Sequence, residues 1–255
     1  MGRALAGRHA LVTGGGTGIG AAVAIALARA GSLVTICGRR LTPLQSIAAE
    51  NPNIRVATAD VTVEASIVKL YEGAEAASGP MDIVVANAGM AESAPVHRTS
   101  LELWNKTLNV NLTGAFLSVK PALAAMRERG FGRVVFIAST AGLKGYAYVA
   151  PYVAAKHGVV GLTRALALET ASTGITVNAV CPGFTETPML AKSIDRITET
   201  TKRSATDVRT SLAALNPQGR FIQPQEVAEV VLWLCSGASG SITGQAISVS
   251  GGETW

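Results

Sequence analysis

The sequence predicts an α/β fold in a single domain, and three observations point to it. Short runs rich in Val, Ile and Thr alternate with longer runs rich in Ala and Leu. The short runs are apolar throughout, which is typical of strands buried on both faces of a parallel sheet. No linker or shift of composition divides the 255 residues, so we expect one domain over residues 1–255.

The short runs are expected to be seven strands, at residues 9–13, 33–37, 54–58, 82–86, 133–138, 176–180 and 246–249. The longer runs are expected to be helices, at residues 19–30, 44–50, 63–78, 101–129, 152–172, 189–215 and 224–235. Such alternation gives a parallel sheet with helices on both faces, because its crossovers are right-handed. We therefore predict a Rossmann-type doubly wound sheet with the strand order 3-2-1-4-5-6-7.

Composition excludes several classes of protein. Hydrophobic residues make up 48% of the chain and charged residues 15%, which argues against disorder. No apolar run is long enough to cross a bilayer, and residues 1–8 lack the apolar core of a signal peptide. The net charge of +5 comes from scattered cations, which argues against a nucleic-acid partner. Cys37, Cys181 and Cys235 are too widely spaced to suggest disulfides or a metal, so we expect a cytoplasmic protein without a metal site.

A glycine-rich loop lies between the first expected strand and the first helix. It reads Thr13-Gly-Gly-Gly-Thr-Gly-Ile-Gly20. Glycines let the backbone turn sharply and approach a pyrophosphate, and the next helix offers free N–H groups at its positive end. The cofactor-binding residues predicted here are Gly14, Thr17, Gly18, Ile19 and Gly20.

The end of the second strand indicates which dinucleotide binds. An acidic residue there would bind the ribose 2′-hydroxyl of NAD, whereas an Arg would hold the 2′-phosphate of NADP. This chain has Gly38 followed by Arg39, so we favour NADP(H), with NAD(H) as the alternative. Two solvated surface arginines, Arg39 and Arg40, are the plainer interpretation. Asp60 and Val61 follow the third strand, where Asp60 could be a simple helix cap. They equally resemble the Asp-Val pair that lies beside the adenine in classical short-chain dehydrogenases/reductases.

Tyr152 and Lys156 stand four residues apart in an expected helix, so their side chains leave the same face. An ammonium beside a phenol favours the phenolate and is expected to lower the pKa of Tyr152 from about 10. Such a pair suits proton transfer to or from the oxygen of a ketone or an alcohol.

These motifs together resemble the classical short-chain dehydrogenase/reductase family over nearly the whole chain. The glycine loop is similar to the family's TGxxxGxG pattern, and Asn87-Ala88-Gly89 is similar to its NAG turn. Ser139 lies thirteen residues before Tyr152, which is the usual spacing in that family. The resemblance extends to Asn111 in the helix after the NAG turn and to a PGxxxT segment that holds the nicotinamide, here Pro182, Gly183, Thr185 and Thr187.

The resemblance implies an NAD(P)-dependent oxidoreductase, and a ketoreductase in the direction of reduction. The catalytic set is then Asn111, Ser139, Tyr152 and Lys156, with Tyr152 as general acid/base. Ser139 would hydrogen-bond the reacting oxygen. Lys156 would also bind the nicotinamide ribose, and Asn111 would hold a water that links Lys156 to solvent.

The substrate side is less determined. The family's variable flap corresponds to about residues 187–215, and its mildly basic charge suits an acidic substrate such as an acyl-CoA thioester or a carboxylate, although a solvated helix face explains it more simply. Residues 215–220 resemble family members that act on 3-hydroxyacyl-CoA or 3-hydroxybutyrate. Tyr146 and Tyr148 are expected either to line the substrate cleft or to pack on the surface.

Apolar residues on more than one face of helices 101–129 and 152–172 indicate packing against another subunit. The resemblance implies a homotetramer formed through these helices, with a dimer as second choice. A nucleotide-binding regulatory protein without catalysis is the alternative from another class. A halohydrin dehalogenase on this scaffold would have Arg at position 156 and no nucleotide loop, so this third hypothesis fits less well.

Overall fold

The computed structural model describes residues 4–255 and confirms the predicted sheet. Seven strands run in the order β3-β2-β1-β4-β5-β6-β7, and every neighbouring pair is parallel. Their bounds are β1 His9–Thr13, β2 Leu33–Gly38, β3 Ile54–Thr58, β4 Ile83–Ala86, β5 Gly132–Ile137, β6 Ile175–Pro182 and β7 Ala246–Val249. Strands β1, β4, β5 and β6 are buried along their whole length, which explains why their sequences are apolar without alternation.

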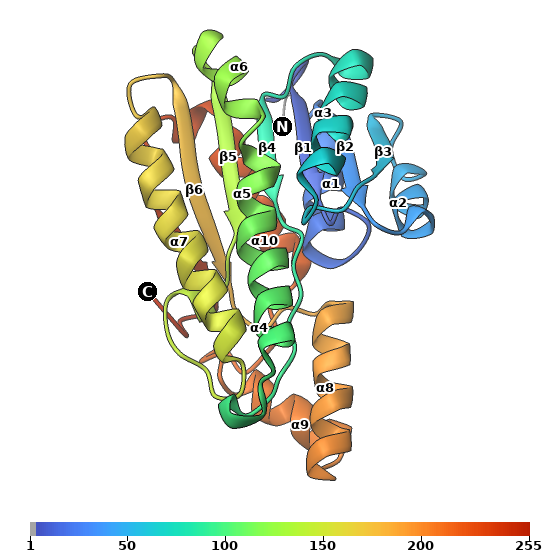
Figure 1. Ribbon diagram of the computed structural model, residues 1–255, viewed down its shortest axis with the longest axis vertical. Helices are drawn as coiled ribbons and strands as arrows, with labels where there is room; N and C mark the ends of the chain where they lie inside the picture. Colours follow the sequence, from blue (N-terminus) through green and yellow to red (C-terminus); the bar gives the residue numbers. More distant parts are fainter. Residues whose placement is uncertain (1–3) are drawn as a thin grey trace.

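Helices cover the two faces of the sheet and form a three-layer molecule (Figure 1). The core on one face is completed by α1 (Gly18–Arg29), α2 (Leu41–Ala48) and α10 (Pro224–Cys235). The core on the other face is completed by α3 (Glu64–Ser78), α5 (Gly114–Val119), α6 (Ala122–Glu128) and α7 (Ala150–Thr170). Each helix contributes one apolar stripe, so both faces of the central strands are dry.

The prediction of one continuous helix over residues 101–129 is wrong. This stretch consists of α4 (Leu101–Leu108), a π-helical segment η2 (Asn109–Thr113), α5 and α6. Pro121 separates α5 from α6, because proline lacks the N–H that continues a helix. The π-helical segment buries the side chain of Asn111, and such segments occur often at functional sites.

The helix predicted over residues 189–215 is also two helices, α8 (Pro188–Thr201) and α9 (Ala205–Ala213). Lys202 takes a left-handed conformation with φ of 59°, which ends α8. Ser204 then caps α9 by accepting a hydrogen bond from the backbone N–H of Asp207 at 3.1 Å. Both helices extend past the carboxyl ends of the strands (Figure 1).

Three short 3-10 turns complete the secondary structure of the described residues: η1 (Val96–Arg98), η3 (Thr140–Gly142) and η4 (Gly237–Ser239). Within residues 4–255, no helix has both the length and the apolar character needed to cross a membrane. The three cysteines are free and buried, as expected, and burial raises the pKa of each thiol.

Candidate active site

The glycine loop joins β1 to α1 and folds tightly on itself. Gly14 and Gly18 have positive φ angles of 66° and 57°, which L side chains rarely adopt. A Cβ on Gly20 would lie 2.4 Å from the carbonyl oxygen of Gly14 and 2.4 Å from Asn87 Nδ2. The glycines are therefore required by the turn itself and by the close approach of the helix to the loop.

The N-terminus of α1 is free to bind an anion. Thr17 occupies the N-cap position, yet its side chain makes no capping hydrogen bond, and the first turn carries no acidic residue. Ile19 is half-buried against the apolar core and orients the turn. The backbone N–H groups of this first turn therefore remain available, and the positive end of the helix favours a phosphate. These residues fit a dinucleotide pyrophosphate.

Asn87 fastens the end of β4 to the glycine loop. Its Nδ2 donates to the carbonyl oxygens of Thr13 at 2.8 Å and Gly14 at 3.2 Å. The backbone N–H groups of Asn87 and Ala88 both donate to Thr13 Oγ1, at 3.0 and 3.1 Å. Thr13 opens the TGxxxGxG pattern, yet it is not among the predicted cofactor-binding residues, because the pattern alone does not show what its hydroxyl binds.

The ends of β2 and β3 carry the residues predicted to select the dinucleotide. Arg39 is exposed, and a Cβ on Gly38 would meet only Leu44 Cδ2, at 3.8 Å. Asp60 Oδ1 accepts hydrogen bonds from Thr62 N at 2.9 Å and Thr62 Oγ1 at 2.7 Å. These bonds, with a smaller effect of Arg39, hold the pKa of the Asp60 carboxyl below its usual value. Asp60 therefore shapes a turn and is not the cap of α3.

Val61, next to Asp60, is buried and lies against Gly114 at the start of α5. A Cβ on Gly114 would lie 2.7 Å from Val61 Cγ2. This close packing fixes the loop after β3 on the helix that follows the NAG turn.

Ser139, Tyr152 and Lys156 meet where β5 ends and α7 begins. Tyr152 and Lys156 lie one turn apart on α7, with Lys156 Nζ 5.6 Å from the centre of the Tyr152 ring. Lys156 is buried and its Nζ donates to the carbonyl oxygen of Ile137 at 2.7 Å. Ser139 Oγ accepts a hydrogen bond from Ala141 N at 3.1 Å, which leaves the hydroxyl proton of Ser139 to be donated elsewhere.

The expected lowering of the Tyr152 pKa is wrong for this structure. Burial raises the pKa of the Tyr152 phenol above its ordinary value, and the nearby Ser139 hydroxyl opposes that rise only in part. Burial also lowers the pKa of Lys156 to about 8. Desolvation disfavours the charged form of each group and is the largest cause of both shifts.

Asn111 holds the loop that follows the NAG turn. Its Nδ2 donates to the carbonyl oxygens of Met90 and Thr107, both at 2.9 Å, and its Oδ1 accepts from Met90 N at 3.2 Å. A Cβ on Gly89 would lie 2.9 Å from Asn111 Oδ1 and 3.9 Å from Lys156 Nζ. Gly89 therefore lies between these two side chains.

The segment after β6 closes the site over the glycine loop. Pro182 ends β6, and Thr185 Oγ1 donates to the carbonyl oxygen of Gly183 at 2.9 Å. Thr187 Oγ1 donates to the carbonyl oxygen of Thr185 at 3.1 Å and caps α8. A Cβ on Gly18 would lie 3.0 Å from Thr187 Cγ2, so this segment contacts the expected phosphate loop directly.

The two tyrosines left open by the sequence differ in their surroundings. Tyr146 is half-buried, hydrogen-bonded to Thr140 and Glu253, and packed edge-on against Phe184. Tyr148 is 64% exposed and has a positive φ of 68°. Tyr146 therefore packs within the fold next to the serine loop, whereas Tyr148 faces solvent.

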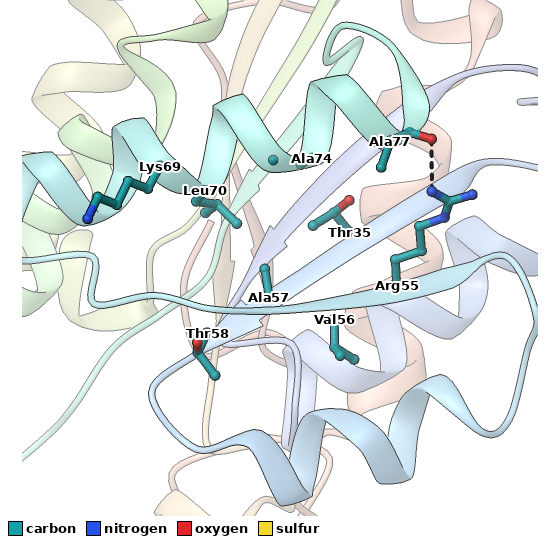
Figure 2. A pocket seen from close by; sticks show the side chains of 10 residues that line it. Thr35, Arg55, Val56, Ala57, Thr58, Lys69, Leu70, Ala74 and Ala77 are labelled. Atoms are coloured by element: carbon teal, nitrogen blue, oxygen red, sulfur yellow. Dashed lines mark hydrogen bonds between the residues drawn. The ribbon is translucent and has the colours of Figure 1, made fainter.

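A separate groove of about 330 Å³ lies between β3 and α3 at the outer edge of the sheet (Figure 2). Thr35, Arg55 and Lys69 are among its lining residues, and Arg55 donates to the carbonyl oxygen of Ala77 at 2.8 Å. None of the predicted catalytic side chains lines this groove. The chemistry therefore belongs to the carboxyl end of the sheet and not to this hollow.

Comparison with known proteins places the chain in a family. The model of the short chain dehydrogenase family matches residues 8–198. A putative ketoacyl reductase of Streptomyces coelicolor is 42% identical over 249 residues, covering 95% of each chain. An acetoacetyl-CoA reductase of Shinella zoogloeoides is 39% identical over 246 residues, covering 96% of this chain and 98% of the relative.

A solved structure agrees with these sequence matches. The crystal structure of a variant of actinorhodin polyketide ketoreductase with NADPH has a TM-score of 0.94 and 40% identity, covering 99% of each chain. The chain belongs to the short-chain dehydrogenase family, as the motifs indicated. It is an NAD(P)-dependent oxidoreductase.

Proposed function

We propose that this protein reduces a ketone to a secondary alcohol with NADPH, and that Tyr152 supplies the proton. The observation that carries this proposal is the meeting of Ser139, Tyr152 and Lys156 beside a glycine loop whose helix N-terminus is open to a phosphate. The relatives named as ketoacyl and acetoacetyl-CoA reductases support the same class of reaction.

The side chains divide the work of the reaction. The bound nicotinamide supplies hydride to the carbonyl carbon. As negative charge grows on the carbonyl oxygen, Ser139 donates its free hydroxyl proton in a hydrogen bond to that oxygen. Tyr152 transfers its phenolic proton to the same oxygen, and its raised pKa keeps it protonated until then.

Lys156 and Asn111 support the proton transfer. The ammonium of Lys156 has three donors, and the bond to Ile137 uses one of them, which leaves two for a ribose hydroxyl and a water. As Tyr152 loses its proton, the adjacent positive charge stabilises the phenolate. Asn111 holds the loop at Met90 and, beside Gly89, lies close to Lys156, where a water could link the two side chains.

The preference for NADPH rests on Gly38 and Arg39. Gly38 removes the carboxylate that would repel a 2′-phosphate, and the exposed Arg39 guanidinium is free to bind it. The structural relative carries NADPH, which supports this choice. NADH is the alternative cofactor.

For the substrate we propose a 3-oxoacyl thioester, with the flap at about residues 187–215 covering it. The support comes from the relatives' names and not from the flap's charge. Arg209 is already paired with Glu186 at 2.7 Å, and Arg196 lies 3.7 Å from Glu92. These two flap cations are therefore engaged within the protein.

We further propose that the chain is one domain over residues 1–255 and forms a homotetramer in the cytoplasm. Leu101, Phe116 and Leu168 are 73%, 42% and 82% exposed on the helices expected to pack between subunits. The three free, buried cysteines suit a reducing compartment. Light scattering that gives a monomer at every concentration would refute the tetramer.

Tyr152→Phe tests the proposed chemistry directly. The variant removes only the phenolic oxygen, so kcat for a ketone should fall by about 100-fold or more while NADPH binding is kept. Tyr148→Phe is the matched control, since Tyr148 is exposed and should retain full turnover. Normal turnover by Tyr152→Phe would show that another group supplies the proton.

A substrate panel tests the cofactor and the substrate class. Simple ketones and 3-oxoacyl thioesters would be assayed separately with NADPH and with NADH. We expect the highest kcat/KM for a 3-oxoacyl thioester with NADPH. A strong preference for NADH would refute the role given to Arg39, and no reduction of any ketone despite tight dinucleotide binding would favour a regulatory protein.

A further inference from the structure

We propose that Glu253 is a positioning residue for the catalytic serine loop and acts on it through Tyr146 and Thr140. This inference rests on the proposed reductase function, because its consequence for turnover is measured in that reaction. Glu253 lies close to the end of the chain, far in sequence from residues 139–146. Within the fold, its carboxylate lies against that loop.

The contacts form a chain that starts at the carboxylate. Glu253 Oε1 accepts a hydrogen bond from the Tyr146 hydroxyl and lies 3.1 Å from Lys144 Nζ. The Tyr146 oxygen is 2.7 Å from Thr140 Oγ1. The phenol has only one proton, and a carboxylate oxygen is a stronger acceptor than a hydroxyl. We therefore infer that the Tyr146 hydroxyl donates to Glu253 and that the Thr140 hydroxyl donates to the phenol oxygen. Thr140 follows Ser139 directly.

The aromatic ring of Tyr146 adds a second connection. It packs edge-on against Phe184, with ring centres 6.1 Å apart and planes at 88°. Phe184 belongs to the segment expected to hold the nicotinamide. Tyr146 therefore contacts both the serine loop and that segment, and Glu253 fixes the hydroxyl end of the ring.

The cost of burying this carboxylate argues that its position matters. The Glu253 side chain is 1% exposed, and its Oε2 is buried without a hydrogen-bond partner among residues 4–255. Lys144, its ion-pair partner, is 39% exposed. A buried ion pair of this kind is often no better for stability than an apolar side chain of equal volume. A residue with only a packing role would need no charge here. Charged groups buried against the general preference for apolar side chains are typical of functional sites.

The network holds Tyr146 in the donor form. Burial and the bond to Glu253 raise the pKa of the Tyr146 phenol far above its ordinary value. Tyr146 therefore keeps its proton and remains a hydrogen-bond donor. Tyr146 thereby holds the Ser139 loop at a fixed distance from Glu253 in the C-terminal segment.

Glu253→Met and Glu253→Gln separate positioning from stability. Methionine fills the volume without an acceptor, so we expect a kcat about tenfold lower, and the melting temperature measured alongside reports any loss of stability. Glutamine keeps an acceptor for Tyr146 and should restore most of the turnover. Tyr71→Phe is the control and should leave kcat unchanged. It removes another buried tyrosine hydroxyl, which donates to the Ser118 carbonyl oxygen on α5 at 2.6 Å and not to the serine loop.

A double-mutant cycle tests the route through Tyr146. Tyr146→Phe should lower kcat about as much as Glu253→Met, and the double variant should be no slower than either single one. Effects that multiply, or full turnover by Glu253→Met, would overturn the proposal.

Hydrogen exchange of the backbone amides in residues 139–146 gives a readout that needs no turnover. Exchange should become faster in Glu253→Met than in the wild type and in Tyr71→Phe. Wild-type protein that reduces no ketone would refute the proposed function, yet the exchange measurement would still decide whether Glu253 holds the loop. Unchanged exchange in Glu253→Met would refute the positioning role.

Discussion

Lys156 Nζ donates a hydrogen bond of 2.7 Å to the carbonyl oxygen of Ile137, the last residue of β5. This bond fastens α7 to the strand that delivers Ser139 two residues later, and Tyr152 lies one turn before Lys156 on the same helix. The hydrogen bond to the Ile137 carbonyl therefore helps to position Tyr152 and Lys156 beside Ser139. Lys156 consequently has a part in folding that can be separated from its part in catalysis.

Lys156→Met reveals the contribution of Lys156 to folding through the pH dependence of the free energy of unfolding. The folded-state pKa of Lys156 is about 8, against an ordinary value of 10.5 for a lysine in the unfolded chain. Between these values the unfolded chain holds a proton that the folded chain has lost, so wild-type stability rises with pH in this window. Relative to Lys156→Met, the free energy of unfolding should increase by about 3 kcal/mol from about pH 7 to about pH 10.5.

Denaturant unfolding of both proteins at fixed concentration measures this difference. Groups common to both proteins cancel. Lys69→Met, which removes an exposed lysine from α3, controls for the loss of a cation. A difference between wild type and Lys156→Met that stays flat over this pH range would show that burial does not perturb Lys156.

Arg39→Ala should weaken the binding of NADPH without affecting the binding of NADH. Loss of a charge-assisted contact to the 2′-phosphate predicts a KM for NADPH about tenfold or more higher. Arg40→Ala removes the next exposed arginine and is the matched control. Steady-state kinetics with both dinucleotides measures the effect. The assignment fails if both variants behave alike.

Gly38→Asp should reverse the preference toward NADH. A Cβ at this position would meet only Leu44 Cδ2, at 3.8 Å, so the backbone here accepts a side chain without a clash at its first atom. The new carboxylate would bind a ribose 2′-hydroxyl and repel a 2′-phosphate. The ratio of kcat/KM for the two dinucleotides gives the answer, and an unchanged ratio would contradict this location for the ribose.

Asn111→Ala should reduce both stability and turnover. The substitution leaves the partly buried backbone groups of Met90 and the buried carbonyl of Thr107 without the Asn111 side chain as a partner, which we expect to cost about 1–3 kcal/mol. The loop beside the nicotinamide loses its anchor as well. Asn109→Ala is the control, since Asn109 lies in the same π-helical segment with its side chain exposed. Thermal unfolding and kcat of both variants would be compared, and equal behaviour would refute the anchor.

The sheet could be predicted because its central strands are buried on both faces. A run such as residues 133–137 has no polar alternation, and only a covered parallel strand tolerates that. The errors fell in the helices. Pro121 could have been used to divide residues 101–129, whereas the left-handed turn at Lys202 has no comparable sequence signal.

The candidate site could be predicted where the chemistry depends on local spacing. Tyr152 and Lys156 are four residues apart on one helix, so their proximity follows from helical geometry alone. The contacts of Thr13, the Ile137 carbonyl and Glu253 could not be predicted, because each joins segments that are separate in the sequence. A backbone oxygen has no residue type, and Glu253 reaches Tyr146 across 107 positions of sequence, which no periodicity reveals.

Gly20→Ala should damage the nucleotide loop, whereas Gly73→Ala should stabilise the protein. A Cβ on Gly20 would lie 2.4 Å from the Gly14 carbonyl oxygen and from Asn87 Nδ2, so the loop must move at a cost of about 1–3 kcal/mol. The same move displaces the N–H groups expected to bind the pyrophosphate, so the Kd for NADPH should rise. Gly73 lies exposed within α3 with nothing within 4 Å of an added Cβ, and alanine there should add about 0.5–1 kcal/mol. Thermal unfolding and NADPH titration of both variants would be compared, and tight NADPH binding by Gly20→Ala would place the dinucleotide elsewhere.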